Sequence, residues 1–385
     1  MKLLKTTKRI AALGLSVLMA ASIAQAGSLP KEVKIGGLMP LTGNAGFVGV
    51  ELRKGLDLAL AEYHKNLPEG LPSIDVIYVD SQADPRMGFQ GYQRLVTRDE
   101  VKVIVLTYTS VAKAAAPQAI RDKTGMMNVT QGPVTELGKN FTSTLPPYSM
   151  QGLAVLKYAV SKLGLKRIAV IYENSEAFVA AMENLRDVAC PQVGCEVVAS
   201  EEIPAGATDI AAQVTAALAT NPDAVFPIGI QAQTIPVVRE LHTRDYKGQI
   251  IGNGELGAII SAGSGNLIEG AIYPTYAYEK DNPDFIRVSK AVMDATGKEA
   301  TQYLFLGYQA GQVVAGVMAQ MDKMGLEWSG DNFIKAQIAG KFSTIMGEVS
   351  FLEDGRIVEP MTMMEVKDGK GVAVGKVLPE DLIEK

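Results

Sequence analysis

The strongest constraint on the fold is a regular alternation of short apolar strands with amphipathic helices. Strand-like segments such as "EVKIGGLM", "IDVIYVD", "VKVIVLTY" and "RIAVIYE" are each followed by a segment with helical periodicity. In the first of these helices, residues 49–64, apolar side chains recur every three or four positions. They are Leu52, Leu56, Ala59, Leu60 and Tyr63. The alternation predicts parallel sheets with helices on both faces.

The number of alternating units indicates how the chain is divided. A single sheet with all of these strands would be unusually wide, so we predict an α/β fold of two doubly wound lobes. The pattern is interrupted at Pro146 and Pro147, in "STLPPYSMQG", and a second interruption falls in residues 274–285. The final segment, residues 347–377, is hairpin-like, with Asp-Gly turns at 354–355 and 368–369.

The first 26 residues differ from the rest in character. Four basic residues precede an apolar run, and the small residues Ala24-Gln25-Ala26 follow it. This pattern predicts a signal peptide, residues 1–26, that is cut after Ala26 and directs the chain to the periplasm. A membrane anchor is the weaker alternative, because the apolar run is shorter than the ~20 residues of a spanning helix.

Removal of this segment changes the charge balance. The whole chain has a formal net charge of −5, and residues 1–26 contain four of its 37 lysines and arginines and none of its 42 acidic residues. The mature chain would therefore carry −9, and no basic stripe remains to suit a nucleic acid partner.

The two cysteines, Cys190 and Cys195, lie close together in "DVACPQVGCEVV". In an oxidising compartment they can pair, and we predict a structural disulfide between them. Two free thiols or a metal pair are the alternatives. Zinc usually takes four ligands, and the chain has only two histidines to add, His64 and His242.

Motifs for phosphate binding and catalysis are absent. The loop "LTGNAGFVG" has glycines at 43, 46 and 49, a spacing that fits neither G-x-x-x-x-G-K-[ST] nor G-x-G-x-x-G. The sequence also lacks H-E-x-x-H and G-x-S-x-G. These absences favour a binding protein without a cofactor over an exported enzyme.

Four blocks of the chain resemble the periplasmic amino-acid-binding proteins of ABC transporters, of the Leu/Ile/Val-binding type. They are "KIGGLMPLTGNAGFVGVELRKGLDLALAEY", "VIYVDSQADPRMGFQGYQRLVTRDEVKVIV", "EEIPAGATDIAAQVTAALATNPDAVF" and "QIIGNGELGAIISA". The resemblance implies a type I periplasmic binding fold, with three crossover segments and a ligand cleft between the lobes. A third crossing is expected at 350–360. The implied lobes are residues 27–147 with 280–355, and 148–279 with 356–385.

The resemblance also implies a grip for the α-carboxylate of a ligand. Ser110 occupies the position whose hydroxyl and backbone bind the carboxylate, beside Tyr108 and Thr109. The next position is filled by Gln131, Gly132 and Pro133, where the family often has a small residue and a Ser or Thr. Pro133 has no N–H to donate, so this departure affects the carboxylate grip.

Other predicted contacts come from both lobes. Glu255 falls within one residue of the family's acid that pairs with the ligand ammonium. Phe178, which follows Tyr172 and Ala177, matches an aromatic residue that closes on the ligand. The remaining predicted wall residues are Phe47, Val48, Ile230, Gln231 and Tyr303. Structural alternatives exist: Ser110 as a helix N-cap, Glu255 as a surface acid, and Phe178 and Tyr303 as core residues.

The implied function is that of a periplasmic substrate-binding component of an ABC importer. Such a protein would act as a monomer without a cofactor, bind an amino acid with an apolar side chain, and dock on an inner-membrane ABC permease. An aromatic or aliphatic carboxylate without an amine is an alternative ligand. A ligand sensor for a membrane receptor is an alternative role.

Overall fold

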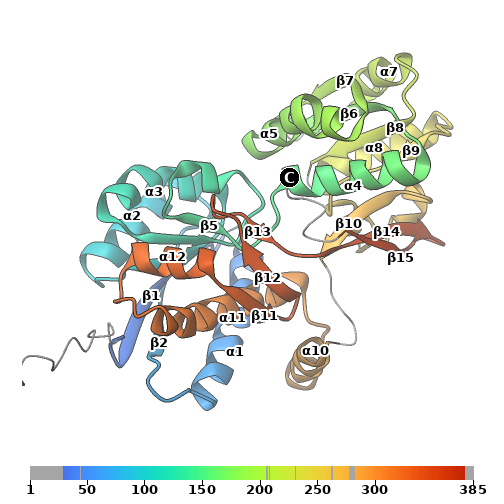
Figure 1. The fold of residues 1–385 in the computed structure, drawn as a ribbon. Coiled ribbons are helices and arrows are strands. Elements are labelled where there is room, and N and C mark those ends of the chain that lie inside the picture. Colours follow the sequence, from blue (N-terminus) through green and yellow to red (C-terminus); the bar gives the residue numbers. More distant parts are fainter. Residues whose placement is uncertain are drawn as a thin grey trace, which may run out of the picture.

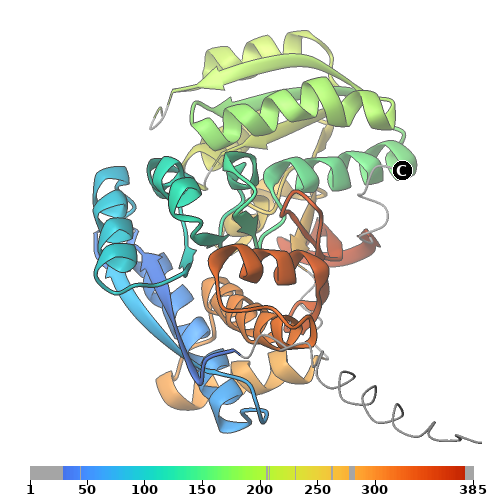
Figure 2. The same ribbon diagram turned by 60° about the vertical axis from the view of Figure 1, so that its left-hand side comes forward.

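The computed structural model describes residues 29–377, except 44, 205–206, 208, 230, 262 and 277–281. The predicted signal peptide lies outside the described residues. Two groups of elements are visible in Figure 1, and Figure 2 shows the same ribbon turned about the vertical axis. The α/β fold of two lobes that the sequence predicted is confirmed.

The first lobe is built on a parallel five-stranded sheet with the order β2-β1-β3-β4-β5. Its elements are β1 (Glu32–Met39), α1 (Gly46–Lys65), β2 (Ser73–Asp80), α2 (Pro85–Thr97), β3 (Val103–Leu106), α3 (Thr109–Asp122), β4 (Gly125–Asn128), a 3₁₀ turn (Val134–Leu137) and β5 (Phe141–Ser143). Side chains of one strand alternate between two cores: Val103 and Val105 join one, Ile104 and Leu106 the other. The sheet is therefore covered on both faces.

The second lobe is built on a parallel four-stranded sheet with the order β7-β6-β8-β9. Its elements are α4 (Tyr148–Leu163), β6 (Arg167–Glu173), α5 (Glu176–Asn184), a π turn (Leu185–Ala189), α6 (Cys190–Val193), β7 (Glu196–Ile203), α7 (Ala211–Ala219), β8 (Ala224–Ile228), α8 (Gln231–Thr243), β9 (Gln249–Ile250), α9 (Leu256–Ser261), a 3₁₀ turn (Gly265–Ile268) and β10 (Ile272–Tyr276). Here too neighbouring residues divide between two cores, with Val170 in one and Ile171 in the other.

The C-terminal third contributes to both lobes. It contains α10 (Pro283–Thr296), α11 (Gln302–Lys323), α12 (Gly330–Ala339), β11 (Lys341–Thr344), β12 (Gly347–Phe351), β13 (Ile357–Val358), β14 (Met361–Lys367) and β15 (Lys370–Val377). The three helices and the β11-β12-β13 sheet pack with the first lobe (Figure 1). The strands β14 and β15 form an antiparallel sheet with β10 beside the second lobe. The predicted Asp-Gly turns join β12 to β13 and β14 to β15.

Helices α1 and α11 are held unusually close by glycines. A Cβ atom on Gly55 of α1 would overlap the carbonyl oxygen of Leu304 on α11. One on Gly307 would overlap the carbonyl oxygen of Leu52. Larger residues at these positions would push the helices apart. The contact fixes the C-terminal helices to the first lobe.

The chain crosses between the lobes three times, and prolines lie in the first and third crossings. The first runs through Pro146 and Pro147, from β5 to α4. The second lies between β10 and Pro283, partly outside the described residues. The third follows β13 and contains Pro360. Strand β13 pairs with β12 and so belongs to the first lobe. The third crossing therefore begins after β13, shortly beyond residue 355, where the first lobe was predicted to end. The exact lobe boundaries remain a prediction.

A buried carboxyl group lies at the third crossing. Glu359 is 1% exposed, and its Oε2 accepts a hydrogen bond of 2.8 Å from the side-chain amide of the equally buried Gln309 on α11. The Oε1 atoms of both side chains have no hydrogen-bond partner among the described residues. Burial raises the pKa of Glu359 to about 8, against the opposing effect of the bond from Gln309.

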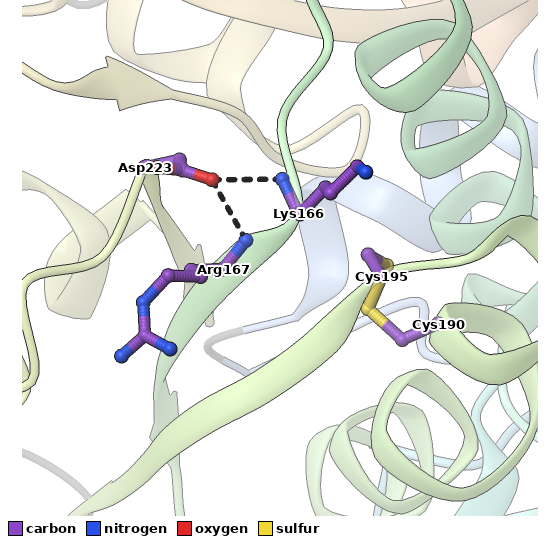
Figure 3. The surroundings of a disulfide bond; sticks show 5 residues. All are labelled: Lys166, Arg167, Cys190, Cys195 and Asp223. Carbon is purple, nitrogen blue, oxygen red and sulfur yellow. Dashed lines mark hydrogen bonds between the residues drawn. A yellow bond between two sulfur atoms is a disulfide. The ribbon is translucent and has the colours of Figure 1, made fainter.

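The structure contains the disulfide that the sequence predicted, between Cys190 and Cys195 (Figure 3). It joins the start of α6 to the residue before β7, at the edge of the sheet where the strands begin. In the same region the Asp223 carboxylate accepts backbone hydrogen bonds from Lys166 and Arg167, 2.8 and 2.9 Å long, which lower the pKa of that carboxyl. Ligand sites in such sheets lie at the opposite edge, so we assign the disulfide a structural role.

Replacing both cysteines with serine tests this assignment. Loss of the cross-link should lower the free energy of unfolding by about 2 kcal/mol, because the closed loop is short. Ligand affinity should stay the same. Denaturant titration and calorimetry on the same preparations measure both quantities. A large loss of affinity in the variant would contradict a purely structural role.

Glu359→Gln is predicted to make stability less dependent on pH. The native protein keeps the proton of Glu359 until pH 8 or so, whereas the unfolded chain releases it near the ordinary value of ~4.3. Stability of the wild type should therefore fall as the pH rises through this window. The variant, compared with the wild type, should be similarly stable at pH 5 and clearly more stable at pH 8.

Denaturant titrations at several pH values measure this difference. The exposed Glu353→Gln, from the preceding turn, is the matched control and should follow the wild type. Parallel pH profiles for the Glu359 variant and the wild type would show that this carboxyl does not carry the effect.

Candidate ligand-binding site

A cavity of about 460 Å³ lies between the two lobes. It continues into a recess of about 90 Å³, and both are lined by Gln131, Leu145, Glu255, Tyr303 and Leu306. The cavity meets the carboxyl ends of β3 and β4 in the first lobe and of β6 in the second. Strand order reverses between β1 and β3 and between β6 and β8, and ligands bind at such switch points in open α/β sheets.

The first-lobe wall is formed by the start of helix α3. Tyr108, the residue before the helix, has a φ of 75°, which is uncommon for a residue with a side chain. This conformation turns the chain sharply from β3 into α3. The first hydrogen bond of the helix is from Ala112 to the Tyr108 carbonyl, so the N–H groups of residues 109–111 have no acceptor among the described residues. These three N–H donors form a binding site for an anionic group.

The loop after β4 packs directly against this helix start. A Cβ atom on Gly132 would overlap the Thr109 hydroxyl, so only glycine permits the close approach. The hydroxyls of Thr109 and Thr130 lie 3.4 Å apart. In the same loop the Gln131 side-chain amide donates a hydrogen bond to the Tyr276 hydroxyl at the end of β10. That bond connects the two lobes at the back of the cavity.

Glu255 supplies a carboxylate to the cavity from the loop between β9 and α9. The Tyr148 hydroxyl donates a hydrogen bond of 3.2 Å to its Oε1. Burial raises the pKa of Glu255, and the bond from Tyr148 opposes this rise. Burial, together with the charge of Glu255, also holds the pKa of Tyr148 well above its usual value, so the phenol stays protonated. The Tyr148 ring packs on Phe178, with centroids 5.2 Å apart.

The Glu255 loop is tied to the first crossing by one side chain. Gln151, on the first turn of α4, is 3% exposed. Its amide nitrogen donates to the Pro146 carbonyl at 3.0 Å, and its oxygen accepts the Gly254 N–H at 3.0 Å. The next residue is fixed by a bond of 3.2 Å from the Glu255 N–H to the Asn253 side chain. These bonds set the position of the Glu255 carboxylate relative to the crossing.

An ion pair connects the lobes at the edge of the cavity. Lys113 of α3 contacts the carboxylate of Glu176 at the start of α5. Both side chains remain in part exposed, so the pair contributes little to stability by itself. It does neutralise Glu176, one of the acidic residues that line the cavity.

Nine of the predicted site residues line this cavity. They are Val48, Tyr108, Thr109, Ser110, Gln131, Gly132, Phe178, Glu255 and Tyr303. Ser110 lies within the first turn of α3 and is not its N-cap. Phe178 is both buried in the second-lobe core and part of the wall, and Tyr172 on the preceding strand is a core residue. Their contact with a ligand stays a prediction.

Two predicted residues do not line this cavity, and their contact with a ligand stays a prediction. Phe47 and Val48 are consecutive on α1 and point about 100° apart, so only Val48 faces the cavity. Phe47 is 61% exposed and packs edge-on against Tyr303. Pro133 precedes the 3₁₀ turn and lines two hollows outside the cavity. Ile230 lies outside the described residues, as does the side chain of Gln231.

Several lining residues were not predicted from the sequence. They include Leu52, Thr107, Thr130, Leu145, Tyr148, Glu173, Ser175, Glu176 and Leu306. Glu173 could have been found, since it ends a strand of a parallel sheet, where ligands bind. Tyr148 carried no such signal, because its place follows from the path of the first crossing.

The family model described as "Periplasmic binding protein" matches residues 32–371. The chain belongs to this family. Its members are solute-binding proteins and not enzymes.

Individual relatives are more distant. The Leu/Ile/Val-binding protein homolog 2 of Brucella abortus (strain 2308) is 22% identical over 365 residues, which are 92% of this chain and 95% of the relative. A solute binding protein of an ABC transporter from Rhodopseudomonas palustris BisB5, solved with 3,4-dihydroxybenzoic acid, has a TM-score of 0.74 and 22% identity. The alignment covers 91% of this chain and 98% of that one.

A third neighbour is the branched-chain amino acid transporter substrate binding protein LivJ of Streptococcus pneumoniae, solved with isoleucine. It has a TM-score of 0.72 and 20% identity, covering 90% of this chain and 99% of that one. These comparisons show that the chain has the same fold as substrate-binding proteins of ABC transporters. In the described part of the chain, no helix is both long and apolar enough to cross a membrane.

Gln151→Leu is predicted to weaken both stability and ligand binding. The substitution keeps the volume but leaves the Pro146 carbonyl and the Gly254 N–H without partners, at a cost of about 1–3 kcal/mol in unfolding free energy. Affinity should fall as well, because the Glu255 loop loses its anchor. Denaturant titration and calorimetry measure the two effects. Gln93→Leu, an exposed position on α2, is the control; equal effects in both variants would contradict the proposed anchor.

Proposed function

We propose that this chain binds an α-amino acid in the cavity between its lobes. The proposal rests on one observation, that the same cavity contains a binding site for an anionic group and a carboxylate that can bind a cationic group. The open start of α3 can receive a carboxylate, and Glu255 can receive an ammonium group. An α-amino acid has both groups on neighbouring atoms.

The carboxylate of the ligand would be bound by backbone N–H groups and would need no basic side chain. Three N–H groups at the start of α3 lack acceptors among the described residues, and the hydroxyls of Thr109 and Ser110 lie beside them. A helix N-terminus also carries a partial positive charge. Together these donors can hold a carboxylate through charge-assisted hydrogen bonds.

The ammonium group of the ligand would be bound by Glu255. Its carboxylate is largely removed from water, and the only hydrogen bond to its side chain within the described structure comes from Tyr148. A ligand ammonium would supply the missing counter-charge, and its binding would restore the ordinary preference of Glu255 for the ionised form.

The charge of the cavity argues against a carboxylate without an amine. Glu173, Glu176 and Glu255 line it, whereas no lysine, arginine or histidine does so among the described residues. The pair with Lys113 offsets only Glu176. An aromatic acid such as the 3,4-dihydroxybenzoic acid of the Rhodopseudomonas protein would bring a further negative charge to this surface. It remains the alternative ligand.

The body of the ligand would lie against apolar side chains. Val48, Leu52, Leu145, Phe178 and Leu306 line the cavity, which suits a side chain with an aliphatic stem. The naming of the Brucella relative as a Leu/Ile/Val-binding homolog and the isoleucine in the Streptococcus structure support this assignment.

The physiological role follows from the family. The exported chain would lose residues 1–26, act as a monomer in the periplasm, and close its two lobes, with the boundaries predicted above, on the amino acid. The closed form would then dock on an inner-membrane ABC permease, completing the importer.

Glu255→Gln tests the proposed ligand class. The variant keeps the shape of the side chain and removes its charge. For an amino acid, affinity should fall by roughly 2–5 kcal/mol, as when one partner of a buried charge pair is removed. For a carboxylate without an amine, affinity should be unchanged or higher. A thermal-shift screen of amino acids and organic acids finds the best ligand, and calorimetry measures both proteins with it.

The control is Glu69→Gln, which removes a carboxylate from an exposed turn of the first lobe. A pH series adds a second measurement. Protonation of Glu255 at low pH should weaken binding of an amino acid to the wild type and leave the variant less affected. If the variant binds its amino acid as tightly as the wild type does, Glu255 is not the ammonium partner.

A further inference from the structure

A second carboxylate on the cavity wall, that of Glu173, has one buried oxygen without a hydrogen-bond partner among the described residues. Glu173 ends strand β6 and lines the cavity, yet it is only 8% exposed. Its Oε2 is buried without a hydrogen bond, and no ion pair with its side chain is found in the described parts of the chain. A carboxylate this deeply buried is usually matched by a donor or a cation.

A second unpaired acceptor lies next to it. Gln233, near the start of α8, is also 8% exposed, and its Oε1 has no partner among the described residues. Gly229 lies between the two side chains. A Cβ atom there would be 3.3 Å from the Cβ of Gln233, 3.4 Å from that of Glu173, and 3.5 Å from Glu173 Oε2. The missing side chain at 229 thus lets the side chains of Glu173 and Gln233 lie close together, and of the two it is Glu173 that lines the cavity.

The place of this cluster in the fold points to ligand binding. Glu173 ends β6, and Gly229 follows β8, the two strands between which the order of the second sheet reverses. Such a reversal is where ligands bind in open α/β sheets. The first lobe uses its own switch point for the carboxylate site at α3. The second lobe presents the Glu173 carboxylate at the corresponding place.

We propose that Glu173, with the side chain of Gln233 packed beside it, forms a subsite for a cationic group at the far end of the ligand side chain. The ligand class is then an amino acid whose aliphatic stem ends in an ammonium or guanidinium group, such as lysine, ornithine or arginine. This inference rests on the proposed function, because it assigns the α-carboxylate to α3 and the α-ammonium to Glu255.

The charges of such a ligand match those of the cavity. A dibasic amino acid has two positive groups and one negative group. Glu255 and Glu173 would each face one of the positive groups, and the α3 start would face the carboxylate. The aliphatic stem would cross the apolar part of the wall. A branched-chain amino acid would leave the Glu173 carboxylate buried and unpaired when the lobes close, which is unfavourable.

The test compares ligands that differ in the terminal group alone. Calorimetry measures the binding of L-lysine and of L-2-aminoheptanoic acid, in which a methyl group replaces the terminal ammonium. L-Arginine and L-citrulline form a second pair, and L-leucine and benzoate are included. The wild type should bind the cationic member of each pair tighter by a factor of roughly 30 or more.

Variants then assign this preference to the subsite. Glu173→Gln should abolish the preference by weakening lysine and arginine, with little change for the uncharged analogues. Glu183→Gln, on the exposed side of α5, is the matched control and should keep the preference. Glu173→Gln should also raise the melting temperature of the ligand-free protein, because it removes a buried unpaired charge. The selectivity of the wild type decides the question even if a variant does not fold.

The outcomes separate the two proposals. Tight binding of leucine and 2-aminoheptanoic acid with weak binding of lysine and arginine would overturn the subsite and leave the proposed amino acid function intact. Binding of benzoate without any amino acid would overturn both. Preference for the cationic ligands that persists in Glu173→Gln would place the cation elsewhere and overturn the role of Glu173.

Discussion

The parallel direction of the strands is the constraint on which the rest of this structure depends. It places every strand's carboxyl end at one edge of its sheet, so the loops that follow these ends gather side chains from distant parts of the sequence. In the first lobe this edge brings residues 107–110 beside residues 129–132. In the second it brings Glu173 beside Gly229. A ligand cavity results wherever two such edges face each other.

Polar side chains at the crossings keep the two edges in position. Gln151 connects the first crossing to the loop that carries Glu255, while Gln309 and Glu359 form a buried pair at the third. Gln131 and Tyr276 make a further bond between the lobes. Buried hydrogen bonds of this kind add modestly to stability, but losing one partner is unfavourable, and this asymmetry favours one arrangement. The site geometry therefore depends on the polar residues at the crossings as well as on the walls of the cavity.

Periodicity was sufficient to predict much of the fold from the sequence. The strand 167–173 was predicted with the bounds that the structure shows, because its apolar run is clearly delimited. The start of α2 also follows from local sequence, since Asp84 precedes Pro85 and its side chain accepts the Met87 N–H at 2.8 Å. Local signals of this kind need no knowledge of tertiary contacts.

The site was harder to predict, because its residues meet only through the tertiary fold. Ser110 and Glu255 were found through a family resemblance, and both line the cavity. The start of the first helix was expected at residue 49, whereas α1 begins at Gly46 and places Phe47 on its exposed side. Tyr148 and Gln233 could not be found, since the path of the chain between lobes and the missing side chain at 229 set their positions.

The prolines at the first and third crossings have a consequence for the cost of ligand capture. Each fixes one backbone torsion in a segment that connects the lobes, so the ligand-free protein has fewer relative lobe orientations to sample. Capture of a ligand selects one orientation and loses the entropy of the others. A chain that starts with few orientations loses little, and more of the contact energy is left for affinity. Pro146, Pro147 and Pro360 thus pre-organise the cleft from outside it.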